Sequence, residues 1–130
     1  MLTLAKLLRT HGTEDAALVL VGSSFAQAGR HNFRMPLYSL GKSMIPTLTH
    51  ALAVELGAHG QRCIGISYDV IDAGMNQRMT RSSRAAHAGR TPSGVLPTAV
   101  DAAAQVAWVL GNRSNLLSGA MLSLTGGALP

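Results

Sequence analysis

The sequence contains one cysteine, few aromatic residues and no long apolar run. The single thiol, Cys63, excludes a disulfide within the chain, and its apolar neighbours predict a buried, unreactive side chain. No apolar run reaches the roughly 20 residues that a membrane-spanning helix needs. The start, Met-Leu-Thr-Leu, has no basic stretch followed by a long apolar core. We therefore expect no signal peptide and a cytoplasmic location.

Acidic residues are scarce, six against eleven Lys and Arg, which gives a net charge of +5. Four arginines lie between Arg78 and Arg90 in a segment without acid, but no aromatic residue is interleaved with them. This pattern predicts a solvated helix face or a lid facing an anion, and we expect neither nucleic acid nor a membrane as partner. The five histidines have no spacing typical of metal ligands, so we expect no metal site.

The hydrophobic pattern predicts one α/β domain over residues 1–130, with about three parallel strands and helices on both faces of the sheet. Three short apolar runs are typical of buried parallel strands, namely Ala16–Val21, Arg62–Tyr68 and Gly119–Leu124. Three longer segments predict helices, namely Leu2–Thr10, Leu37–Gly57 and a helix from Thr98 to Leu110, with a short helix between residues 76 and 94.

The spacing of apolar residues also predicts which side of each helix is buried. We expect the first helix to bury Leu4, Leu7 and Leu8. The long helix is expected to bury Ile45, Leu48, Leu52 and Leu56. For the last helix the expected stripe is Val100, Ala103, Val106, Ala107 and Leu110.

Tyr38 and Lys42 begin the long helix and are four residues apart, so they lie on one face. An ammonium next to a phenol favours the ionised phenolate, and such a tyrosine can exchange a proton with a carbonyl or alcohol oxygen. Ser23 and Ser24 follow the first strand, and a serine hydroxyl can hold that same oxygen. By itself, a lysine four residues after a tyrosine is a weak motif.

The order of three motifs resembles the C-terminal half of the short-chain dehydrogenase/reductase family. These motifs are the strand that ends in Gly22-Ser23-Ser24, the Tyr38/Lys42 pair and the terminal Gly126-Gly127. The resemblance implies part of a doubly wound, Rossmann-like sheet and a catalytic Ser-Tyr-Lys triad. Ser24 matches the family's catalytic serine best. Ser23 is the alternative, because the loop to Tyr38 is about one residue longer than is usual in the family.

The resemblance also implies a small carbonyl or alcohol substrate and NAD or NADP as hydride carrier, held in part by Tyr38 and Lys42. A family threonine that contacts the nicotinamide falls on Ala73 here, and the family's preceding Pro-Gly falls on Tyr68-Asp69. A further catalytic asparagine of the family would fall at or before Met1. The loop from Phe25 to Pro36 would border the substrate pocket.

No Gly-x-Gly-x-x-Gly occurs in the sequence, so the turn that binds a dinucleotide's pyrophosphate has no counterpart here. We expect the first strand to be a sheet edge that pairs with another chain. The partner is expected to be a complementary N-terminal half or, in a homo-oligomer, a second copy; a truncated remnant is the third option.

Two other functions stay open beside the oxidoreductase. One is a non-redox pseudoenzyme that serves as an oligomeric binding or assembly module, which the Ala73 replacement and the missing glycine-rich turn favour. The other keeps Tyr38 and Lys42 as an acid/base pair for isomerisation or dehydration without a cofactor. A serine hydrolase is disfavoured, because Gly22-Ser-Ser-Phe-Ala26 lacks the second glycine of a nucleophile elbow.

Overall fold

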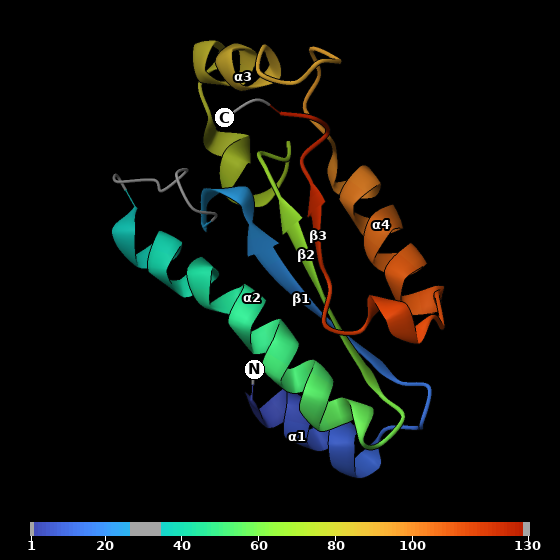
Figure 1. Cartoon of the computed structure of the whole chain (residues 1–130). Helices are drawn as coiled ribbons and strands as arrows, with labels where there is room; N and C mark the ends of the chain where they lie inside the picture. The colour runs from blue at the N-terminus through green and yellow to red at the C-terminus, as the bar shows by residue number, and fades with distance from the viewer. Residues whose placement is uncertain (1, 27–34, 129–130) are drawn as a thin grey trace.

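A computed structural model describes residues 2–26 and 35–128. Three strands alternate with helices, as Figure 1 shows. The strands are β1 (Ala17–Ser23), β2 (Arg62–Tyr68) and β3 (Met121–Leu124). The α-helices are α1 (Leu2–His11), α2 (Pro36–Gly57), α3 (Arg81–Ala88) and α4 (Ala99–Gly111). Three short 3-10 helices are η1 (Ser24–Ala26), η2 (Gly74–Arg78) and η3 (Asn115–Leu117).

The strands form one parallel sheet in the order β1-β2-β3, with α1 and α2 on one face and α4 on the other (Figure 1). This confirms the expected α/β class with helices on both faces. Each predicted strand is present, and β1 extends two residues beyond Val21 to include Gly22 and Ser23. Within the described sheet β1 lies at one edge, as expected.

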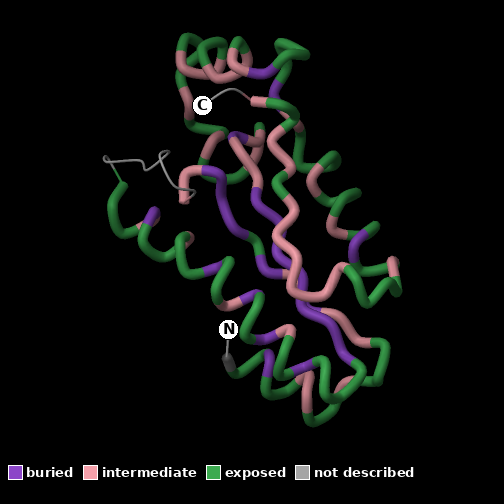
Figure 2. Tube along the Cα trace, in the orientation of Figure 1, coloured by how far each residue is buried: buried purple, intermediate pink, exposed green. Residues whose placement is uncertain are grey.

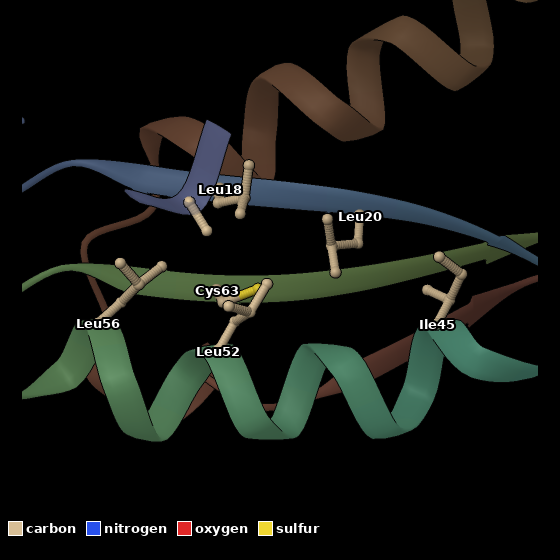
Figure 3. Close-up of a cluster of buried hydrophobic side chains, with 7 residues drawn as sticks. Leu18, Leu20, Ile45, Leu52, Leu56 and Cys63 are labelled. Atoms are coloured by element: carbon tan, nitrogen blue, oxygen red, sulfur yellow. The ribbon is translucent and has the colours of Figure 1, made fainter. Parts of the chain in front are cut away.

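The face toward α2 carries the larger core. Because side chains alternate along a strand, Leu18 and Leu20 of β1 and Cys63 of β2 point to the same side. They meet buried residues that step along α2, as Figure 3 shows, namely Ile45, Leu52 and Leu56. The predicted stripe of the long helix is therefore confirmed, with Leu48 packed at its margin. Burial raises the pKa of the Cys63 thiol to about 11, in line with the expected inert thiol.

The opposite face packs against α4 through Ile64 and Ile66 of β2 and Val109 of α4, all fully buried. The purple segments of Figure 2 follow β1 and β2, so the middle of the sheet is the most buried part of the chain. This burial is typical of a parallel sheet covered by helices.

The predicted stripe of the last helix is correct only at Val106, which packs against this core. Val100 is 77% exposed and Leu110 is 45% exposed, while Val109, outside the stripe, has no exposed surface. Nearly every side of α4 carries small apolar residues, so its pattern selects no single face. A capping box begins α4: the Thr98 hydroxyl accepts from the Asp101 amide, and the Asp101 carboxylate accepts from the Thr98 amide and hydroxyl. Those hydrogen bonds to Thr98 lower the pKa of Asp101.

The predicted face of the first helix is only partly correct. Leu8 packs against the core, but Leu4 and Leu7 are 56% and 51% exposed, and Ala5 is the buried residue. A small residue at this position lets α1 approach its neighbours closely. Two leucines are thereby left on the surface.

No helix in the described ranges is long and apolar enough to cross a lipid bilayer. Pro46 lies in the interior of α2, which runs on to Gly57. Proline has no N–H, so the Lys42 carbonyl four residues earlier loses its usual helical partner.

We predict that Leu56→Ala lowers the free energy of unfolding by about 2–5 kcal/mol, because it opens a cavity in a fully buried site. Leu40→Ala on the same helix is the matched control, since Leu40 is mostly exposed. Urea unfolding of both variants measures the difference. Equal losses would contradict the core assignment.

Candidate functional site

The three strands are parallel, so their carboxyl ends meet at one edge of the sheet. Ser23 ends β1, Tyr68 ends β2, and Gly126-Gly127 follow β3. Helix α3 and its connections lie beyond this edge in Figure 1. Open α/β sheets bind their ligands in the crevice outside the carboxyl ends of their strands. The predicted site residues Ser23 and Ser24 lie at this edge.

Helix α2 brings Lys42 back to the same edge. The Lys42 ammonium donates a 2.8 Å hydrogen bond to the Val21 carbonyl of β1, although the two residues are far apart in sequence. The same nitrogen lies 5.9 Å from the centre of the Tyr38 ring. At this distance a cation still interacts favourably with an aromatic ring. The structure thus places the amine beside the phenol ring, as the helical spacing predicts.

The two candidate serines differ in their surroundings. The buried Ser23 hydroxyl accepts a 3.3 Å hydrogen bond from the Phe25 amide and retains its own proton for donation. Ser24 is fully buried, and its hydroxyl has no hydrogen-bond partner within the described part of the chain.

A cavity of about 200 Å³ lies between α2 and the carboxyl end of the sheet. Both Lys42 and Ser23 line it, whereas Tyr38, Ser24 and Ala73 are not among its lining residues. The remaining lining residues are Gly22, Ala26, Pro46, Ser67, Met121 and Ser123.

Ser67 is a residue that the sequence analysis missed. It is only 3% exposed, and its hydroxyl has no hydrogen-bond partner among the described residues. It stands in the middle strand, where the register aligns Gly22 of β1, Ser67 of β2 and Ser123 of β3 in one row. Only the strand register could have revealed this row, because Ser67 belongs to an otherwise ordinary buried strand.

Close approach at Gly65 shapes one wall of the cavity. A Cβ atom at Gly65 would lie 1.9 Å from the Met121 sulfur, so no larger residue fits while Met121 crosses β2 here. The Met121 methyl group also lies in contact range of Gly22. The flexible methionine therefore fills part of the space that these glycines leave, and the cavity is the remainder.

Ala73 lies in the connection after β2, outside the cavity. Its extended backbone precedes η2. The connection is held in place by an ion pair between Asp72 and Arg84 and by a 2.9 Å hydrogen bond from the Asn76 amide to the Ile71 carbonyl. A methyl side chain at position 73 offers no hydrogen bond to a ligand.

A second hollow of about 400 Å³ lies on the α4 side of the same edge and is bordered by Tyr68, Gln105 and Thr125. The Tyr68 hydroxyl donates to the Ala102 carbonyl at 2.9 Å, and burial raises its pKa. Residues 27–34, most of the loop expected to border the substrate, lie outside the described residues. Within the described ranges no three His, Cys, Asp or Glu side chains come together as metal ligands.

A family profile described as Enoyl-(Acyl carrier protein) reductase matches residues 1–128. The chain belongs to the short-chain dehydrogenase/reductase family. No curated protein sequence matches it.

Solved structures share the fold. A short-chain dehydrogenase/reductase (glucose/ribitol dehydrogenase) from Brucella melitensis is 23% identical, with a TM-score of 0.80 over 91% of this chain and 47% of its own. A 3-oxoacyl-[acyl-carrier protein] reductase from the same organism is 23% identical and has a TM-score of 0.73. The match covers 86% of this chain and 41% of the reductase. ElxO, solved with NADP bound, is 23% identical and has a TM-score of 0.79. The match covers 98% of this chain and 51% of ElxO. The chain therefore spans about half the length of these structures.

We predict that Lys42 reacts with an amine-acylating reagent several times more slowly than Lys6. The Lys42 amine donates to Val21 and lines the cavity, whereas Lys6 is exposed. Peptide mass spectrometry after limited acetylation compares the two lysines in one sample. The difference should vanish in denaturant, and equal rates in the folded chain would contradict the described position of Lys42.

Proposed function

We propose that this chain supplies the catalytic half of a NAD(P)-dependent oxidoreductase that interconverts a carbonyl and an alcohol. The observation that carries the proposal is the meeting of α2 and β1, where the Lys42 amine lies 5.9 Å from the Tyr38 ring and shares a cavity with Ser23. Family membership supports the reaction class.

In this proposal a serine hydroxyl holds the substrate oxygen, and Tyr38 donates or accepts the proton on that oxygen. Lys42 lies beside the Tyr38 ring and is proposed to hold the nicotinamide ribose. Ser24 has the better motif match, and its hydroxyl makes no hydrogen bond to any described residue, so it can bond to a substrate oxygen. Ser23 already lines the cavity beside Lys42, so both serines are tested below.

A nicotinamide dinucleotide, when bound, would supply or accept the hydride. The donors at this edge fit the ribose end of such a group, because Lys42 retains two N–H donors beyond its bond to Val21. The pyrophosphate end finds no glycine-rich turn in this sequence. We therefore propose that phosphate binding comes from a complementary N-terminal half beside β1.

The substrate is proposed to be a small carbonyl or alcohol compound. Acyl-carrier-protein reductases give their name to the matching family profile and to one structural neighbour. We therefore propose to test two kinds of substrate, namely acyl groups carried by acyl carrier protein and free carbonyl compounds.

We predict that the chain, mixed with a glycine-rich half from a solved relative, binds NADPH and reduces a carbonyl substrate. Tyr38→Phe should then lower kcat about 10²–10⁴-fold, because it removes the proton donor. NADPH fluorescence measures binding, and loss of its absorbance measures turnover. Comparison of Ser23→Ala with Ser24→Ala identifies the serine that holds the substrate.

Tyr68→Phe is the matched control, since it removes the chain's other phenol, which donates to Ala102. It should leave kcat nearly unchanged. Absence of NADPH binding, both alone and with the companion half, would remove the oxidoreductase proposal. Full activity of Tyr38→Phe would remove the assigned proton donor. Turnover without nucleotide would favour the Tyr38/Lys42 isomerase or dehydratase instead.

A second candidate is an oligomeric binding or assembly module. The observation that favours it is the apolar surface of α1 and α2, where several large side chains are mostly exposed: Leu4, Leu7, Leu37, Leu40, Met44 and Val54. If these helices form a subunit interface, the chain should be a stable homodimer regardless of nucleotide. Light scattering at micromolar concentration tests this, and a monomer would contradict it.

A further inference from the structure

The cavity between α2 and the sheet is built from polar and small residues in the middle of an apolar fold. Among the described residues that line it, Lys42 alone carries a formal charge, and none is Asp or Glu. Gly22, Ser67 and Ser123 form its floor, one residue from each strand in register. The cavity is therefore positively charged.

Its hydrogen-bonding groups are mostly donors. The Lys42 ammonium has three N–H groups and uses one on Val21. The Ser67 hydroxyl, buried and without a partner among the described residues, has one proton to give. Ser23 accepts from Phe25 and keeps its own hydroxyl proton. A buried hydroxyl left unpaired is costly, so a partner that accepts from it is favoured.

The size limits the occupant. At about 200 Å³ the cavity exceeds the room that one water needs, roughly 10–15 Å³. It is smaller than the roughly 300–1,000 Å³ of a typical drug-sized pocket. An anion of two or three carbons fits between these limits, and carboxylate oxygens are acceptors only.

We propose that this cavity is a binding site for a small carboxylate, held by the Lys42 ammonium and the Ser67 hydroxyl. A neutral oxygen compound would gain less here, because hydrogen bonds to a charged acceptor are roughly twice as strong as neutral ones. The inference goes beyond the oxidoreductase proposal, because it needs neither hydride transfer nor a dinucleotide.

The test is an NMR titration of the ¹⁵N-labelled full chain with acetate at constant ionic strength and neutral pH, without nucleotide. Acetamide, of nearly the same shape but uncharged, is the matched ligand. We expect saturable shifts of the Gly22 and Ser67 amides with acetate, with a dissociation constant of about 1 mM, and at least tenfold weaker binding of acetamide.

Variants assign the site to its residues. Ser67→Ala should weaken acetate binding about tenfold, and Lys42→Met should abolish saturation. Ser67→Cys gives a second variant of similar size, and an unchanged amide spectrum shows that each variant is folded. Ser43→Ala is the matched control on α2, because its hydroxyl donates to Leu40 and it does not line the cavity. Its affinity for acetate should equal that of the unaltered chain.

Three results would overturn the proposal. Equal binding of acetate and acetamide would show a polar cavity without preference for an anion. Unchanged affinity in folded Ser67→Ala would exclude Ser67 as a ligand. Shifts that never saturate, or that lie away from the cavity, would leave only water as its occupant.

Discussion

The hydrogen bond from the Lys42 ammonium to the Val21 carbonyl joins the start of the long helix to the end of the edge strand. The rest of the site depends on it, because it fixes the charge at the carboxyl edge of the sheet. The core behind it holds the helix in place through Ile45, Leu52 and Leu56. Packing along the following turns of α2 therefore decides where the amine lies, and the position of the adjacent phenol follows from the helix geometry.

Small residues at the strand ends create the space beside this amine. Gly22, Ser67 and Ser123 share a row across the sheet, and Gly65 lets Met121 cross the middle strand. The Ser67 hydroxyl, which has no hydrogen-bond partner among the residues that the structure describes, is a local cost of the kind that proteins tolerate at binding sites. The two apolar layers on either side of the sheet offset it. The apolar residues along the strands thus stabilise the fold, while the small and polar residues at their carboxyl ends form the cavity.

Membership of the short-chain dehydrogenase/reductase family explains this arrangement without fixing the activity of the chain. Related folds carry different reactions, so function is argued from the site. Here the Lys42 amine lies beside the Tyr38 ring, while the sequence has no glycine-rich turn for a pyrophosphate. The chain also spans about half the length of its structural neighbours.

The sequence by itself determined the order of the elements, the parallel sheet and the facing of Tyr38 and Lys42, because helical and strand periods are local properties. It predicted the buried side of α2 and failed for most of α4, where small apolar residues lie on nearly every side. Only the tertiary structure decided that Ser67 faces the cavity beside Lys42 and that Ser24 lies outside it. Those facts depend on strand register and on how closely α2 approaches the sheet, which no single segment encodes.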